Sequence, residues 1–315
     1  MITVICPVYN EEAYIKHVLD FCVSAAPTNK EVFFIDGNSS DKTKAIIQEY
    51  SIKYPFIKLL HNSQQYVPFA LNIAIKQASG DIIIRLDAHT EYANDYFEKI
   101  IQTFQKTKAD IVGGPMRIAK GSNIQNAIGY ATSTMFGVGN SSFHFENFEG
   151  FTDSVYLGAW KKNIFETTGL FDESMMRNQD DEFHYRAKSF GFKIYQSPEI
   201  KLYYYPRNSF KKLFKQYFQY GLYKPVVLKK VSSAISLRHF IPALFVLYLA
   251  SVPFLLAFKW YWLLLPLLLY VFINFYFSCR AKQNVPQTFR IFYSYLILHL
   301  SYGIGFIKGL IKKPV

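Results

Sequence analysis

The 315 residues of this chain are enough for one large domain or two smaller ones, and 50% of them are hydrophobic. Residues 1–199 carry 19 Lys and Arg against 23 Asp and Glu, whereas residues 200–315 carry 16 Lys and Arg and no acid. A basic, aromatic tail indicates a partner that is nucleic acid or a membrane surface. The long apolar runs in this tail favour the membrane, and we expect no nucleic-acid partner.

The cysteines and the N-terminus indicate where the first part of the chain resides. Cys6, Cys22 and Cys279 show neither metal-ligand spacing nor a disulfide framework, which is typical of a reducing compartment. The first eight residues lack the basic and long apolar segments of a signal peptide. We therefore expect the first two thirds of the chain to stay in the cytoplasm.

Strands and helices alternate along the first 112 residues. Buried runs predict strands over residues 2–6, 31–35, 56–60, 82–87 and 111–112. Helical spacing predicts helices between them, around residues 15–22, 42–54, 67–78 and 95–106. This alternation with short turns predicts an α/β fold, a mainly parallel sheet with helices on both faces.

The middle of the chain is less regular. Residues 116–159 are rich in Gly, Asn and Ser and indicate a flexible loop over a site. We expect a short helix over residues 160–167 and a second over 180–190, which opens with three acids. Residues 193–196 and 201–205 read as strands.

The tail contains one amphipathic and three apolar segments. Residues 209–223 predict a helix lying in a membrane interface. The charge-free runs 240–258 and 260–278 are each long enough to cross a bilayer of roughly 30 Å, and only Lys259 separates them, which predicts a tight hairpin. Basic residues flank the pair and put both flanks in the cytoplasm. A crossing by residues 291–307 would export three lysines, so we expect a re-entrant or interfacial segment there.

Two polar residues end the apolar run 82–87. Asp87 and His89 lie on the same side if the extended geometry persists, and ligands of open α/β sheets bind outside the carboxyl ends of strands. An oxygen and a nitrogen ligand there can hold a divalent metal, and the metal a diphosphate. The alternative is that Asp87 caps a turn and His89 is an ordinary surface histidine.

Four polar motifs follow one another along the chain, each at the end of a predicted strand or helix. They are Pro7-Val8-Tyr9-Asn10-Glu11-Glu12, Asp36-Gly37-Asn38-Ser39-Ser40-Asp41, Asp87-Ala88-His89 and Gln179-Asp180-Asp181-Glu182. This ordered set resembles the family 2 glycosyltransferases, which are inverting enzymes with a GT-A nucleotide-diphospho-sugar transferase fold. It is most similar to the membrane-attached members that build exopolysaccharide, of the succinoglycan glucosyltransferase type. The resemblance implies a cytoplasmic GT-A domain over residues 1–230 and a C-terminal membrane region over residues 231–315.

The resemblance also implies a donor site. Pro7, Tyr9 and Glu11 match the family's nucleotide-base site, and Asp36 matches the carboxylate that accepts from the base or the ribose. Asn72 and Arg85 are expected near the diphosphate, although Arg85 can also face the other side of the sheet.

The metal and the base follow from the other two motifs. Asp87 and His89 match the family's Asp-x-Asp metal motif, with His in place of the second Asp. Mg²⁺ prefers oxygen ligands and imidazole suits Mn²⁺ better, so the metal is either Mg²⁺ or Mn²⁺. Asp180 matches the catalytic base that takes the proton of the acceptor hydroxyl, and Asp181 is the second choice. Helix capping by these acids is the alternative.

Two functions remain open from the sequence. The first is an inverting hexosyltransferase that moves a sugar from a nucleoside diphosphate donor, a UDP-sugar, to a lipid-linked saccharide acceptor. It would be a multi-pass protein of the inner or plasma membrane, with a second copy of itself or a polysaccharide-assembly complex as partner. The second is a non-catalytic, nucleotide-sensing subunit of a polysaccharide synthesis or export complex, which His89 and Gln179 keep open.

Overall fold

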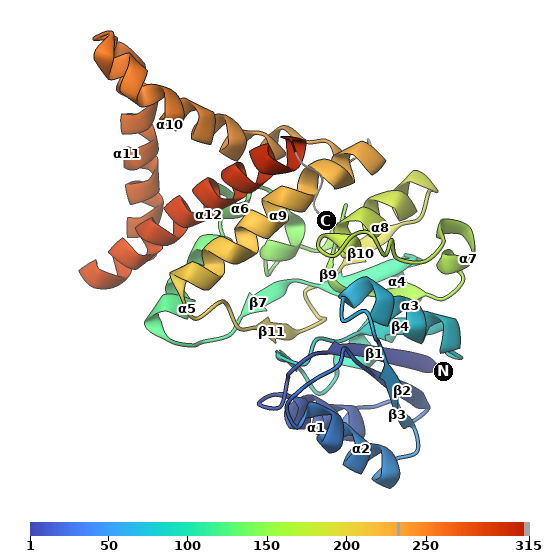
Figure 1. The fold of residues 1–315 in the computed structure, drawn as a ribbon. Helices are drawn as coiled ribbons and strands as arrows, with labels where there is room; N and C mark the ends of the chain where they lie inside the picture. Colours follow the sequence, from blue (N-terminus) through green and yellow to red (C-terminus); the bar gives the residue numbers. More distant parts are fainter. Residues whose placement is uncertain (232–233, 312–315) are drawn as a thin grey trace. The chain divides into compact units, whose positions relative to one another are not determined.

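The computed structural model describes residues 1–231 and 234–311. The chain forms two compact units, one of residues 1–117 and 141–204 and the other of residues 118–140 and 205–315 (Figure 1). Each unit is thus assembled from two separate stretches. The division expected at residue 230 does not coincide with the division between the units.

The first unit is built on an eight-stranded mixed sheet in the order β3-β2-β1-β4-β9-β6-β10-β8. The pairs β1/β2, β1/β4, β2/β3 and β6/β10 are parallel, whereas β9 runs antiparallel between β4 and β6, and β8 antiparallel to β10. The strands are β1 Ile2–Val8, β2 Lys30–Asp36, β3 Ile57–His61, β4 Ile82–Arg85, β6 Ile111–Gly114, β8 Gly150–Phe151, β9 Tyr156–Lys161 and β10 Ile194–Gln196. A three-stranded sheet holds β5 Thr90–Tyr92, β11 Leu202–Tyr204 and β7 Met116–Ile118 in that order.

Helices cover both faces of the large sheet. Helices α1 (Ile15–Ser24), α2 (Thr43–Lys53) and α4 (Tyr96–Thr107) share one core with the sheet. Helices α3 (Val67–Gln77), α7 (Ile164–Thr168) and α8 (Gln179–Ser189) share the other core. The short helix η1 spans Ser142–His144. The predicted mainly parallel sheet with helices on both faces is confirmed.

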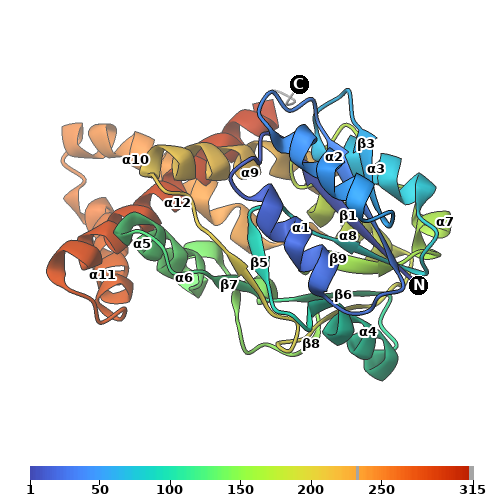
Figure 2. The same ribbon diagram turned by 90° about the horizontal axis from the view of Figure 1, so that it is seen from below.

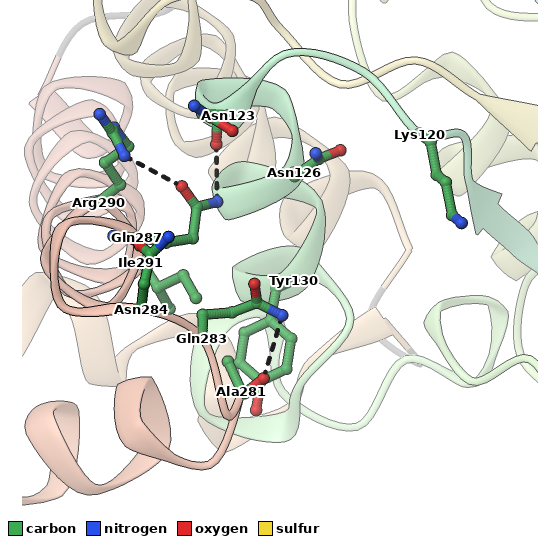
Figure 3. Close-up of a pocket in the computed structure, with 10 residues that line it drawn as sticks. All are labelled: Lys120, Asn123, Asn126, Tyr130, Ala281, Gln283, Asn284, Gln287, Arg290 and Ile291. Carbon is green, nitrogen blue, oxygen red and sulfur yellow. Dashed lines mark hydrogen bonds between the residues drawn. The ribbon is translucent and has the colours of Figure 1, made fainter.

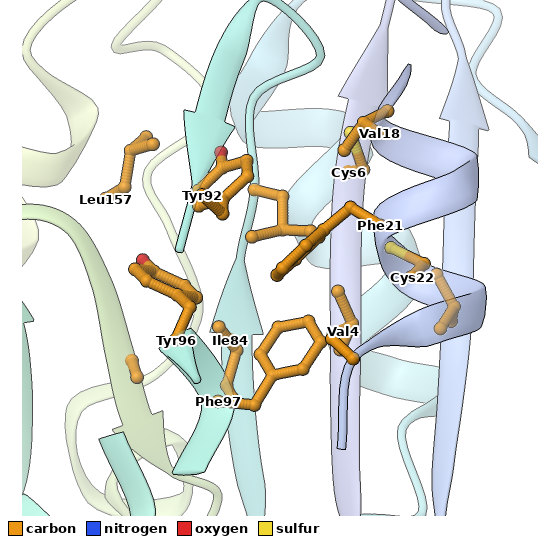
Figure 4. Close-up of a cluster of buried hydrophobic side chains, with 14 of the residues drawn as sticks. Val4, Cys6, Val18, Phe21, Cys22, Ile84, Tyr92, Tyr96, Phe97 and Leu157 are labelled. Atoms are coloured by element: carbon orange, nitrogen blue, oxygen red, sulfur yellow. The ribbon is translucent and has the colours of Figure 1, made fainter. Parts of the chain in front are cut away.

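Strand alternation divides the buried side chains between the two cores. Val4 and Cys6 of β1 belong to the first core, and Ile5 between them belongs to the second. Figure 4 shows Phe21 and Cys22 of α1 packed over the first core. Burial of these apolar side chains holds α1 on the sheet and so fixes the loop between β1 and α1.

Two sequence-based expectations for the middle of the chain are wrong. Residues 156–161 form β9, where a helix was expected from residue 160, and the helix begins only at Ile164. The hydrogen-bond ladders that β9 makes with β4 and β6 outweigh the local preference of these residues for a helix. Trp160 is consequently fully buried in the sheet. Residues 116–159 also contain a regular helix, Asn123–Thr132, whose capping box of Ser122 and Gln125 is legible in the sequence.

The second unit is helical. Its elements are α5 Asn123–Thr132, α6 Met135–Val138, α9 Phe210–Lys230, η3 Leu237–His239, α10 Ile241–Ala257, η4 Tyr261–Leu264, α11 Leu265–Cys279 and α12 Val285–Ile311. Helices α9 and α12 lie side by side (Figures 1 and 2). A Cβ at Gly221 of α9 would lie 2.1 Å from the carbonyl oxygen of Tyr302, and one at Gly305 of α12 would lie 2.1 Å from that of Phe218. Only glycine permits this approach of the two backbones.

Three helical segments among the described residues are long and apolar enough to cross a membrane, namely Leu237–Ala257, Tyr261–Cys279 and Val285–Ile311. The first two are almost entirely exposed, whereas half of the third is buried. Lys259 takes a left-handed conformation (φ 58°) in the short connection between α10 and η4. The predicted segment 291–307 lies inside one unbroken helix, so it lacks the reversal that a re-entrant segment requires.

Candidate active site at the strand ends

The ends of β1 and β2 are tied together by their loops. Val8 pairs with Asp36 in the sheet, and the backbone N–H of Ser39 donates to Asp36 Oδ1 at 3.2 Å. Asn10, with φ 54°, donates its backbone N–H to Ser39 Oγ at 2.9 Å and accepts from the N–H of Ser40 at 2.8 Å. These bonds hold the loop after β1 against the loop after β2.

The predicted base-binding residues are therefore neighbours. Pro7 lies within β1 opposite Ile35, and Asp36 is buried at the end of the next strand. Tyr9 follows β1 with half of its side chain exposed, so its ring remains accessible. A buried carboxylate beside an accessible aromatic ring can hold a flat, hydrogen-bonding base.

The end of β4 carries a fixed ion pair. Arg85 donates from Nε and Nη2 to Asp87 Oδ1 at 3.1 and 3.0 Å. The backbone N–H of Asp87 donates to the Tyr92 hydroxyl at 2.8 Å. Arg85 is buried, whereas the Asp87 side chain keeps 20% of its surface exposed. The Asp87 carboxylate is thus held in place and still reachable, and Arg85 shares its side of the sheet.

His89 connects the β4 end to the β1 end. Its Nδ1 atom lies 3.1 Å from Glu11 Oε1, and both side chains are partly exposed. Glu11 is itself held by its backbone N–H, which donates to Thr43 Oγ1 at 2.8 Å. His89 is therefore part of the cluster at the strand ends and is not an isolated surface histidine.

Helix α8 brings a second acidic group to Arg85. Burial opposes the charge of the Arg85 guanidinium, but the carboxylates of Asp87 and Asp180 outweigh it and raise the pKa of Arg85. Asp180 lies in the first turn of α8, where its Oδ1 accepts from the backbone N–H of Asp181 at 2.9 Å. Both aspartates are partly exposed. Asp87 thus contacts the guanidinium directly, and Asp180 acts on its charge from the start of α8.

Glu182, the third acid of this turn, has a different environment. It is buried and forms a two-point ion pair with Arg186, with Nε to Oε1 at 2.7 Å and Nη2 to Oε2 at 2.9 Å. Arg186 also donates to the carbonyl oxygen of Leu170 at 3.0 Å. Glu182 therefore orients Arg186, and Arg186 ties α8 to the segment before it.

The site also contains a buried histidine that the sequence reasoning missed. His184 lies one turn after Asp180 on α8, and its Nδ1 lies 2.9 Å from Ser154 Oγ. Burial lowers the pKa of His184 to about 4, against the opposing effect of Asp180 and Asp181. Its position four residues after Asp180 puts it on the same helix face, which was the available sequence cue.

Asn72 is engaged at both ends of its amide. Its Nδ2 donates to the carbonyl oxygen of Phe171 at 2.8 Å and to Glu173 Oε1 at 3.0 Å, and its Oδ1 accepts from the Phe171 N–H at 2.9 Å. These bonds fix the segment that leads into α8. The predicted role of Asn72 beside the diphosphate stays a prediction.

The donor set at the strand ends suits one kind of metal site. Among the described residues, no group of three or more His, Cys, Asp or Glu side chains is arranged to hold a metal ion. Asp87 and His89 offer one oxygen and one nitrogen donor. Mg²⁺ is commonly bound by one or two carboxylates together with substrate phosphates and water, so the residues fit a cation that arrives with a diphosphate.

The sequence resembles a known protein family and two named relatives over much of its length. The model of "Glycosyl transferase family 2" matches residues 3–169. The chain is 31% identical over 327 residues to the "Dolichyl N-acetyl-alpha-D-glucosaminyl phosphate 3-beta-D-2,3-diacetamido-2,3-dideoxy-beta-D-glucuronosyltransferase" of Methanococcus voltae, covering 99% of this chain and 97% of that protein. It is 29% identical to the "Succinoglycan biosynthesis protein ExoA" of Rhizobium meliloti, covering 76% of this chain and 73% of that protein.

Solved structures share the fold. A mannosyltransferase from Pyrobaculum calidifontis, solved in complex with GDP-Man and Mn²⁺, superposes with a TM-score of 0.66 at 16% identity, covering 99% of this chain and 88% of that one. The S. aureus protein TarS in complex with UDP-GlcNAc superposes with a TM-score of 0.54 at 17% identity, covering 76% of this chain and 72% of that one. The predicted GT-A type of fold is thereby confirmed.

Proposed function

The chain belongs to glycosyl transferase family 2, and we propose that it transfers a sugar, with inversion, from a UDP-sugar to a lipid-linked saccharide at the cytoplasmic face of a membrane. The observation that carries this proposal is that Asp87, after β4, contacts Arg85 directly, while Asp180, at the start of α8, acts on the charge of the same guanidinium. One carboxylate lies where a diphosphate is expected and the other where an acceptor is expected.

The loops after β1 and β2 bind the donor. The Tyr9 ring packs on the base, and the buried Asp36 carboxylate accepts from the base or the ribose. Glu11 orients His89 through the 3.1 Å contact between their side chains. Arg85 stabilises the diphosphate by its positive charge, which its burial makes more effective.

Asp180 acts as the general base. Its carboxylate takes the proton from an acceptor hydroxyl while the hydroxyl oxygen forms a bond to the anomeric carbon. The bond from that carbon to the phosphate oxygen breaks on the opposite face, and its electron pair leaves with the nucleoside diphosphate. Attack opposite the leaving group inverts the anomeric configuration. Asp181 is the second candidate for this role.

Asp87 and His89 would hold the divalent cation, Mg²⁺ or Mn²⁺. When bound, such a cation neutralises charge that develops on the diphosphate leaving group. The mannosyltransferase neighbour was solved with Mn²⁺, which supports a metal of this class here.

The lipid-linked acceptor is proposed from the relatives and from the apolar helices. The name of the Methanococcus voltae relative specifies a dolichyl phosphate sugar, and ExoA takes part in succinoglycan biosynthesis. An acceptor whose lipid stays in the bilayer requires an enzyme attached to that bilayer. Homo-oligomers and a polysaccharide-assembly complex remain proposals for the chain's protein partners.

The second unit supports a specific membrane arrangement. Helices α10 and α11 expose nearly all of their apolar surface and cross the bilayer as a pair. Helix α9 carries six lysines, which the hydrocarbon region does not tolerate, and α12 packs along it through Gly221 and Gly305. The α9–α12 pair therefore lies along the cytoplasmic surface, and the basic end of the chain stays on that side.

The function is tested with the full chain purified in lipid. A panel of UDP and GDP with Mg²⁺ or Mn²⁺ is scored by thermal shift, followed by transfer of sugar to a short-chain polyprenyl diphosphate saccharide. Asp180→Asn is expected to abolish transfer and retain donor binding. Asp153→Asn, at an exposed aspartate paired with Lys188, is the matched control and retains both activities.

Three results would contradict the proposal. Retained turnover in Asp180→Asn removes the base assignment, and loss of donor binding in that variant assigns Asp180 to the donor site. Donor binding by the wild-type chain without transfer or donor hydrolysis supports the non-catalytic nucleotide-sensing subunit.

A further inference from the structure

The second unit contains a pocket of about 320 Å³ between the start of α5 and the start of α12, and most of the residues that line it are polar. Figure 3 shows Arg290 and Lys120 on opposite sides of the pocket, with Asn126, Gln287 and Tyr130 between them. Gln287 donates to the carbonyl oxygen of Asn123 at 2.8 Å and accepts from Arg290 Nη1 at 3.3 Å. The pocket wall is thus held by specific contacts between α5 and α12.

The charge of this unit is wholly positive. Residues 118–140 and 205–315 contain 16 Lys and Arg and no Asp or Glu. Among the described residues, neither Lys120 nor Arg290 takes part in an ion pair, and Arg290 uses one of its five N–H donors on Gln287. The pocket therefore presents cationic donors to a ligand, with no acidic side chain in the unit to compensate them.

Two further groups strengthen its preference for an anion. The pocket is lined by Asn123, the first residue of α5, and by Asn284, the residue before α12. The Asn284 side chain accepts from the backbone N–H of Gln287 in the first turn of α12. The positive ends of two helix dipoles therefore face the pocket. Burial raises the pKa of the Tyr130 phenol, and Arg280 acts against that effect, which places a third cation nearby. The Tyr130 hydroxyl stays protonated and neutral, and it donates to the carbonyl oxygen of Phe277 at 3.4 Å.

The position of the pocket along the chain identifies the source of the anion. Ala281 and Gln283 of its lining immediately follow α11, whose exposed surface is apolar over its whole length. In the membrane arrangement proposed above, residues 280–284 lie where α11 leaves the hydrocarbon, at the depth of the lipid phosphates. The ligand at that depth is a lipid headgroup.

We propose that this pocket binds the phosphate of a membrane lipid headgroup through Lys120 and Arg290, with the Asn126 and Gln287 side chains and the Tyr130 hydroxyl as neutral neighbours. The lipid is either a bulk anionic phospholipid or the lipid phosphate that carries the acceptor sugar. The inference rests on the membrane placement of α11 and does not depend on the transfer reaction.

Native mass spectrometry of the full chain in detergent tests the proposal without a donor. The probes are phosphatidylglycerol, a short-chain polyprenyl phosphate, inorganic phosphate and diacylglycerol, which lacks phosphate. The double variant Lys120→Gln/Arg290→Gln is expected to weaken binding of a phosphate-bearing lipid at least tenfold and to leave diacylglycerol retention unchanged. Lys259→Gln, which removes one positive charge away from the pocket, in the connection between α10 and η4, is the control.

The lipid probes distinguish the two possible sources of the phosphate, and the outcomes distinguish failure of this proposal from failure of the proposed reaction. Selective loss of polyprenyl phosphate identifies the acceptor lipid, and equal loss of both lipids identifies bulk phospholipid. Equal lipid binding by the wild-type chain and the double variant overturns the proposal, as does binding of inorganic phosphate alone. If the double variant is unstable, Gln283→Trp fills the pocket from an exposed position and is expected to give the same loss. Charge-dependent lipid binding without sugar transfer keeps this inference and rejects the proposed reaction.

Discussion

The Nδ1 atom of His89 lies 3.1 Å from Oε1 of Glu11, which links the residues after β4 to those after β1. Together with Asp87, His89 is the proposed ligand of the metal. Because imidazole suits Mn²⁺ better than Mg²⁺, the wild-type chain should bind donor more tightly with Mn²⁺.

His89→Asp should therefore reduce the preference for Mn²⁺ over Mg²⁺ about tenfold, since it replaces a nitrogen ligand by the oxygen that Mg²⁺ prefers. The measurement is nucleotide affinity by calorimetry with each metal in turn. His17→Asp, at an exposed position of α1, should keep the wild-type ratio. An unchanged ratio in His89→Asp would show that His89 is not a ligand.

Arg85→Gln should destabilise the first unit by about 3 kcal/mol, because it leaves the Asp87 carboxylate without its two-point partner. Arg85→Lys should recover the charge but not the fork of two donors, and so recover only part of the stability. Chemical denaturation followed by tryptophan fluorescence measures both, since Trp160 is buried in this unit. A loss in Arg85→Lys as large as that in Arg85→Gln would mean that charge is unimportant here.

His184 should make stability depend on pH. Burial lowers its pKa from about 6.5 to about 4, so on acidification the unfolded chain binds the proton first. The contribution of neutral His184 to the free energy of unfolding is complete above pH 6.5. It is lost as the pH falls towards 4, and the total loss is about 3 kcal/mol.

His184→Gln should lack this part of the pH dependence. Melting temperatures of the variant and the wild-type chain, measured from pH 7.5 to 4, should converge as the pH falls. His17→Gln, at an exposed histidine, should run parallel to the wild-type chain. A constant difference between His184→Gln and the wild-type chain across this range would rule out a neutral, buried His184.

Gly305→Ala should separate α9 from α12, because its Cβ would lie 2.1 Å from the carbonyl oxygen of Phe218. The expected cost is about 1–3 kcal/mol, typical of overpacking. Melting in detergent measures it, and Ala250→Leu on the exposed side of α10 should have little effect. Unchanged melting of Gly305→Ala would mean that the two helices do not pack closely in the membrane protein.

Cysteine labelling should distinguish a surface position of α12 from a crossing. In a Cys279→Ala background, where Cys6 and Cys22 are buried, an impermeant maleimide added to right-side-out vesicles should label Lys259→Cys and spare Lys308→Cys. Lys282→Cys serves as the cytoplasmic reference. Labelling of both Lys259→Cys and Lys308→Cys from outside would place α12 across the bilayer.

The order of strands and helices in the first unit was accessible from the sequence because its causes are local. The buried face of α1 follows helical spacing, and the runs around Val4 and Ile84 are typical of central strands. Asp36 and Asp87 could be placed at the same edge of the sheet because parallel strands bring their carboxyl ends to one edge. The charge-free runs in α10 and α11 were likewise recognisable as candidate membrane spans from their length.

Only the tertiary structure decided which partner each of these groups meets, because those contacts join residues far apart in the chain. The position of Trp160 in β9 depends on pairing with β4 and β6, which no local pattern encodes. The combined effect of Asp87 and Asp180 on the charge of Arg85 requires the sheet and α8 to be assembled. The α9–α12 contact and the basic pocket depend in the same way on segments that meet only in the folded unit.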